Sequence, residues 1–109
     1  MTLQHVVLFR FPERLNPQAE RQMRSIIERF PELIGTMSKL RFGTDVAAVG
    51  DRTLGFQYLL MMEFASIDTF LAYRDHEAHR ALSAFIRPRL CEVLAFDYDL
   101  TPSTQMLAE

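Results

Sequence analysis

Tyr73, His76 and His79 stand three residues apart in the stretch Tyr73-Arg-Asp-His-Glu-Ala-His79, and the third histidine of the chain, His5, lies near the N-terminus. On a helix, side chains three apart stack along one side, about one turn from each other. An imidazole titrates near neutral pH and can act as a general base. A tyrosine hydroxyl can donate a hydrogen bond to a developing enolate oxygen. This stretch is therefore the first candidate for acid–base chemistry.

A strand pattern positions His5. Residues 4–11 are rich in branched and aromatic side chains, which is typical of a strand, and Pro12 ends the run. Both faces of the strand are apolar at the centre, so we expect cover on both sides. One face carries His5, Val7 and Phe9, and the other carries Val6 and Leu8.

The other hydrophobic patterns complete an α+β fold. Asn16 and Pro17 begin a helix that stops near Pro31. Further strands are expected at 38–45, 56–64 and 93–99, with helices at 67–73 and 76–91, the latter kinked or divided at Pro88. The order β-α-β-β-α-β is the ferredoxin-like plan, an antiparallel four-stranded sheet with helices on one face.

That plan leaves one face of the sheet without helices. An exposed apolar patch at the centre of two strands usually marks an interface, although scattered apolar residues are also tolerated on a surface. We therefore expect a homodimer through the open sheet face. The residues concerned are Val6, Leu8, Leu59 and Met61.

Length and composition limit the classes of protein. The 109 residues predict one domain over 1–100 and a loose C-terminal tail over 101–109. The net charge of −2 gives no reason to expect binding to nucleic acid or to an anionic membrane. No apolar run approaches the ~20 residues that span a bilayer, and no basic leader precedes the first strand. The single cysteine, Cys91, suits a reducing compartment, so a cytoplasmic protein is expected.

Four segments together resemble the stress-responsive A/B barrel (Dabb) domain family of the dimeric α+β barrel superfamily. These segments are residues 5–11, Phe42-Gly43, residues 73–79 and the ending Val93-Leu-Ala-Phe-Asp-Tyr98. The resemblance covers the chain to about residue 100. One departure is Glu77, which stands where the family usually has proline.

The resemblance implies a dimer with an eight-stranded barrel at its centre and a cavity in each protomer between sheet and helices. Some plant members close a linear tetraketide by aldol condensation without a cofactor. Their catalytic histidine and tyrosine correspond to His79 and Tyr73, and His5 matches a further pocket histidine. Ile27 stands where the plant branch has a tyrosine, which implies a smaller or more apolar pocket.

These features lead to one functional hypothesis, a cofactor-free enzyme that acts on a hydrophobic carbonyl compound and needs no metal. His79 removes a proton next to the carbonyl, while Tyr73 and His5 polarise its oxygen. Asp97 could orient one imidazole, but strand parity does not decide this. The apolar residues expected to shape the cavity are Val7, Phe9, Met23, Ile27, Tyr58, Leu60, Met62, Ile86 and Leu90.

Several alternatives stay open. His5, Tyr73 and His79 could form a satisfied buried polar cluster that only holds the fold together. The pocket could bind a small molecule without reaction, or it could serve an oxygen-dependent monooxygenase of the antibiotic-biosynthesis type, which shares the barrel. His76 and His79 could hold a metal with His5, although His76 is expected at a helix start near the surface.

Overall fold

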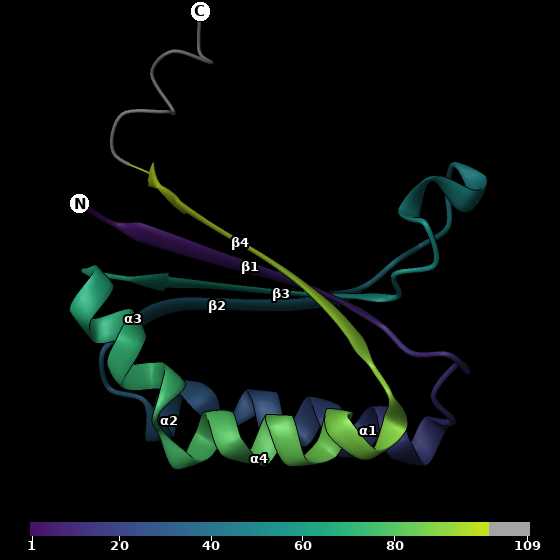
Figure 1. Cartoon of the computed structure of the whole chain (residues 1–109), viewed down its shortest axis with the longest axis horizontal. Helices are drawn as coiled ribbons and strands as arrows, with labels where there is room; N and C mark the ends of the chain where they lie inside the picture. The colour runs from purple at the N-terminus through teal and green to yellow at the C-terminus, as the bar shows by residue number, and fades with distance from the viewer. Residues whose placement is uncertain (101–109) are drawn as a thin grey trace, which may run out of the picture.

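The computed structural model describes residues 1–100, apart from the side chain of Asp51, so the tail expected over 101–109 lies outside the described residues. Strands and helices alternate in two layers, with the sheet above α1 and α4 and with α3 at one end (Figure 1). No helix within residues 1–100 is long and apolar enough to cross a membrane. The elements are β1 (Leu3–Arg10), α1 (Pro17–Glu28), α2 (Phe30–Leu33), β2 (Met37–Thr44), the 3-10 helix η1 (Gly50–Thr53), β3 (Tyr58–Phe64), α3 (Ile67–Arg74), α4 (Glu77–Ile86), the 3-10 helix η2 (Arg87–Arg89) and β4 (Glu92–Asp99).

The sheet has the strand order β2-β3-β1-β4, and every neighbouring pair is antiparallel. This confirms the ferredoxin-like α+β fold expected from the order of elements. β1 is central, and His5 lies opposite Met62 of β3 and Asp97 of β4. Side chains directly opposite each other share a face of the sheet, so this register places Asp97 beside His5.

The core lies between the sheet and the helices. Alternate residues of β3 are fully buried, from Tyr58 to Phe64, as expected for a strand with one covered face. Helix α1 contributes Met23 and Ile27, neither of which is exposed at all. The other large buried side chains in this layer include Phe9, Phe30, Leu60, Met62, Leu82 and Phe85.

Polar caps and prolines determine the helix ends. The Asn16 side chain accepts a hydrogen bond from the Ala19 amide at 2.8 Å, so α1 begins where the sequence predicts. The helix expected over 76–91 is shorter, because the chain tightens into η2 at Pro88. Leu90 then adopts a left-handed conformation with φ of 54°, which turns the chain towards β4.

The opposite face of the sheet is not covered by any helix of residues 1–100 (Figure 1). Val6, Leu8 and Met61 are half-buried there. β4 adds two apolar side chains that the sequence interpretation did not include, Leu94 at 52% and Phe96 at 66% exposed. The open face is therefore more apolar than expected.

The two isoleucines Ile27 and Ile67 test the location of the core. Ile27 is not exposed at all and Ile67 is 49% exposed. Ile27→Ala should lower the free energy of unfolding by about 2–5 kcal/mol, because it leaves a cavity in a packed layer. Ile67→Ala should change it by about 0.5 kcal/mol or less. Urea denaturation measures both, and equal losses would contradict this assignment of the core.

Candidate functional site

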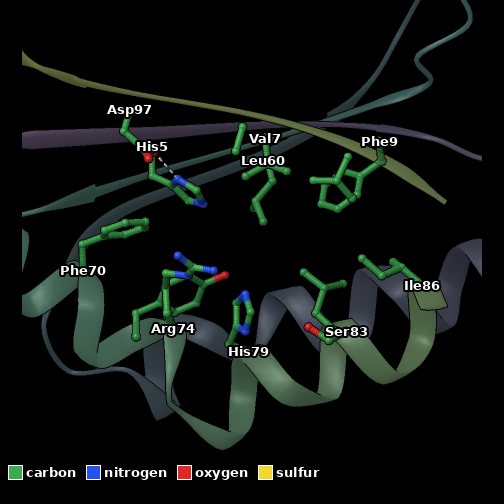
Figure 2. A pocket seen from close by; sticks show the side chains of 14 residues that line it. His5, Val7, Phe9, Leu60, Phe70, Arg74, His79, Ser83, Ile86 and Asp97 are labelled. Carbon is green, nitrogen blue, oxygen red and sulfur yellow. Dashed lines mark hydrogen bonds and ion pairs between the residues drawn. The ribbon is translucent and has the colours of Figure 1, made fainter.

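A cavity of about 230 Å³ lies between the sheet and the helices. Strands β1, β3 and β4 form one wall, and α3 and α4 form the other (Figure 2). Most of the lining is apolar, with contributions that include Val7, Phe9, Leu60 and Ile86. The polar lining residues are His5, Tyr73, Arg74, His79, Ser83 and Asp97.

His5 and Asp97 form a cross-strand pair at the top of this cavity. The Nδ1 atom of His5 contacts a carboxylate oxygen of Asp97, and the rest of the ring points towards the helices (Figure 2). A carboxylate on one ring nitrogen fixes the orientation of the imidazole and leaves the other nitrogen for a ligand. Asp97, whose role strand parity left undecided, therefore orients His5.

The ring of Tyr73 lies near the rings of both His5 and His79. Its ring is 2% exposed and packs edge-on against His79, with 5.0 Å between ring centroids, and lies 6.2 Å from the ring of His5. Burial raises the pKa of the Tyr73 hydroxyl far above its usual value. The phenol therefore stays protonated at neutral pH and can donate a hydrogen bond.

His79 shows the opposite effect on its acid–base equilibrium. Burial lowers the pKa of this half-buried imidazole, and electrostatic interaction with the nearby side chains of Arg74, His5 and Arg87 lowers it further. Asp75 acts in the other direction, with a smaller effect. His79 is therefore neutral near pH 7 and available to accept a proton.

The polar side chains of the cavity differ in whether they have a hydrogen-bond partner. His5 has a partner in Asp97, whereas neither Tyr73 nor His79 forms a side-chain hydrogen bond within residues 1–100. A purely structural polar cluster normally pairs its buried groups with one another. Here a neutral base and a protonated donor face the same cavity, an arrangement suited to proton transfer at a bound ligand.

Five of the residues expected to shape the cavity do not line it. Met23, Ile27 and Met62 lie fully buried in the closed core. The Tyr58 hydroxyl donates to a carboxylate oxygen of Glu20 on α1 at 2.7 Å, away from the cavity. Leu90 is 75% exposed, because η2 ends the helical region before it.

Other lining residues were not among the expected ones. Leu82 and Ser83 follow His79 by three and four residues, so helical spacing could have identified them. Val93 and Ala95 alternate with Asp97 on β4, but only the register with β1 assigns them to the cavity. The sequence carries no comparable signal for Phe70 and Arg74, whose approach depends on where α3 docks.

Two reactive side chains, His76 and Cys91, lie outside the cavity. His76 is the N-cap of α4, where its Nδ1 atom accepts from the Ala78 amide at 3.0 Å. Burial raises the pKa of the Cys91 thiol to about 11, so it is not a thiolate at neutral pH. Within residues 1–100, no group of three or more His, Cys, Asp or Glu residues is placed to hold a metal ion.

Residues 3–100 match the family model described as the stress responsive A/B barrel domain (Dabb). The chain belongs to this family. No curated protein sequence is significantly similar to it. The identification agrees with the resemblance based on the His5 strand and the Tyr73–His79 segment.

Solved structures share the fold of this chain over nearly its whole length. A dimeric ferredoxin-like protein of unknown function from Thermobifida fusca is 27% identical, with a TM-score of 0.80, covering 92% of both chains. The hydroxynitrile lyase of Passiflora edulis is 22% identical, with a TM-score of 0.75, covering 92% of this chain and 95% of the lyase. SnoaB, a cofactor-independent oxygenase from Streptomyces nogalater, is 11% identical, with a TM-score of 0.60, covering 94% and 96%.

The titration of His79 tests the electrostatics of the cavity. Its folded-state pKa should lie below the ordinary 6.5, and Arg74→Gln should raise it by removing a neighbouring positive charge. With a folded-state pKa below 6.5, the unfolded chain binds more protons than the folded chain in this pH range. The free energy of unfolding should therefore fall as the pH drops through 6.5 towards the folded-state pKa. His79→Gln should remove this part of the slope. Ring-proton NMR and urea denaturation provide the measurements, and a midpoint above 6.5 would contradict the assignment.

Proposed function

We propose that this Dabb protein binds a hydrophobic carbonyl compound and catalyses cofactor-free acid–base chemistry at the carbon beside the carbonyl. The observation that carries this proposal is the contact between Tyr73 and His79, with 5.0 Å between their rings, in a mainly apolar cavity. The two groups have pKa values displaced in opposite directions, one upward and one downward. Such divergent pairs are typical of sites that assign separate acid and base roles.

The reaction would begin with proton transfer. A neutral nitrogen of His79 takes a proton from the carbon, and the electron pair of that C–H bond moves to form an enolate. The enolate oxygen accepts a hydrogen bond from the Tyr73 hydroxyl. When His5 is protonated, its second nitrogen donates to the same oxygen while Asp97 balances the charge. The apolar walls strengthen these interactions by excluding water.

An aldol step would complete the cycle. The enolate carbon attacks a second carbonyl of the same substrate, which forms a C–C bond and leaves an alkoxide. The imidazolium of His79 returns its proton to that alkoxide, so no external oxidant or cofactor is consumed. The lyase and the cofactor-independent oxygenase among the structural neighbours support the proposal only in showing that this fold accommodates small-molecule chemistry.

A second candidate function is binding without turnover. It is favoured by the apolar character of most of the cavity lining, which suits retention of a hydrophobic molecule. Both functions require the same cavity. They differ in whether the neutral imidazole of His79 transfers a proton, so a measurement of proton exchange separates them.

Hydrogen–deuterium exchange at carbon tests turnover directly. 4-Phenylbutan-2-one and 2-nonanone, followed by NMR in D₂O, should exchange the protons beside the carbonyl faster with the protein than in buffer. His79→Gln should slow the catalysed exchange about 10²–10⁴-fold, and Tyr73→Phe should slow it about 10²–10³-fold.

His76→Asn is the matched control, because asparagine also caps helices and position 76 lies outside the cavity. Its exchange rate should equal that of the wild type. If the ketones raise the melting temperature but exchange no faster than in buffer, the binding function replaces the enzymatic one.

The open sheet face is proposed to pair with the same face of a second copy. Its apolar side chains are the expected Val6, Leu8, Leu59 and Met61, joined by Leu94 and Phe96 of β4. The structural neighbour from Thermobifida fusca is described as dimeric. A face-to-face pairing would remove this apolar area from water.

A charged substitution tests the dimer. Leu59→Glu combined with Met61→Glu should convert a dimer to a monomer, because two carboxylates cannot be desolvated at an apolar interface without large cost. Leu71→Glu, on the exposed side of α3, should leave the mass unchanged. Sedimentation velocity measures the mass, and a wild-type monomer at micromolar concentration would refute the pairing.

A further inference from the structure

One positive side chain, Arg74, lines the cavity from the last turn of α3. In the view of Figure 2, its side chain extends from α3 towards the sheet, near the labelled rings of His5 and His79. Within residues 1–100, Arg74 forms no ion pair. The cavity therefore has a cation that the rest of the described chain does not neutralise.

Among residues 1–100, the only carboxylate that lines the cavity is already engaged. Asp97 contacts His5 on the opposite side of the cavity from α3 (Figure 2). The positive charge of Arg74 nevertheless acts inside the cavity, because it partly opposes the rise that burial causes in the pKa of Tyr73 and adds to the fall that burial causes in the pKa of His79. An anionic group at the position between these side chains would meet a guanidinium and several hydrogen-bond donors.

A solvated surface charge is the simpler explanation of Arg74. A cation in the last turn of a helix is favourable near the carbonyl ends, and Arg74 is exposed in the chain. This explanation accounts for the residue type but not for the side chain turning into the cavity. Arg80, an exposed arginine of α4 that does not line the cavity, provides the comparison.

We propose that Arg74 binds the carboxylate of the ligand, so that the substrate class is an apolar carbonyl compound that also bears a carboxylate. This inference rests on the proposed function of the same cavity. The planar guanidinium offers two parallel donors that match a carboxylate. The apolar body of the ligand then extends along Val7, Leu60 and Ile86. Fixing one end in this way holds the carbonyl in reach of His79.

Octanoate and octanamide test the charge preference, because they share an apolar chain and differ at the head group. Isothermal titration calorimetry should show octanoate binding to the wild type at least about tenfold more tightly than octanamide, or ~1.4 kcal/mol. Arg74→Gln should remove that preference. Arg80→Gln carries the same change in net charge and should retain it.

Three results would overturn the assignment. These are equal affinity of the two probes for the wild type, equal loss of octanoate affinity in both arginine variants, and absence of binding by either probe at millimolar concentration. Octanoate should also shift the ring resonances of His79, and the shift should disappear in Arg74→Gln.

The proposed function fails by a different measurement. Carboxylate preference without ketone exchange supports the role of Arg74 and overturns the catalytic proposal. Ketone exchange with equal binding of octanoate and octanamide supports the catalytic proposal and overturns the role of Arg74. The two proposals are therefore tested separately.

Discussion

The register of β1 between β3 and β4 is the constraint on which both faces of the molecule depend. β1 pairs with both neighbours over nearly its whole length, with His5 opposite Met62 on one side and Asp97 on the other. Side chains alternate along a strand, so a slip of one residue would turn His5 to the open face and Val6 to the cavity. The apolar residues on both faces oppose such a slip. The hydrophobic pattern of one strand thus fixes the position of a buried polar side chain, His5.

Burial explains most of the electrostatics of the candidate site. The same loss of water that keeps the phenol of Tyr73 protonated keeps the imidazole of His79 neutral, because each charged form is poorly solvated there. Burial thus moves the pKa of the acid, Tyr73, upward and the pKa of the base, His79, downward. His5 differs from both, since its ring contacts the carboxylate of Asp97.

Sequence patterns predicted the fold because local and tertiary signals agree in this chain. The alternation in residues 56–64 and the cap at Asn16 each indicate the element that forms. The approach of His5 to Tyr73 and His79 followed from the same fold, since a middle strand faces the helical layer. These placements depend on period and topology, which a sequence carries directly.

Which residues of that layer border the cavity, and which lie in the closed core, could not be predicted in the same way. Met23, Ile27 and Met62 lie on the expected face of their helix or strand, but neighbouring side chains fill the space around them. Whether such a position borders a void depends on packing between elements, which no single segment encodes. The expectation for Leu90 was wrong for a local reason, because α4 ends early at Pro88. Arg74 was not expected in the cavity because the direction of its side chain depends on tertiary packing.

β4 lies at an edge of the sheet and carries two sets of side chains with different neighbours. Val93, Ala95 and Asp97 border the cavity, whereas Leu94 and Phe96 lie on the open face. A movement of this edge strand that widens the cavity would displace the apolar side chains behind it. Such a movement would couple occupancy of the cavity to the shape of the open face. Any partner that favours one position of β4 changes ligand affinity by the same factor by which the ligand changes affinity for the partner.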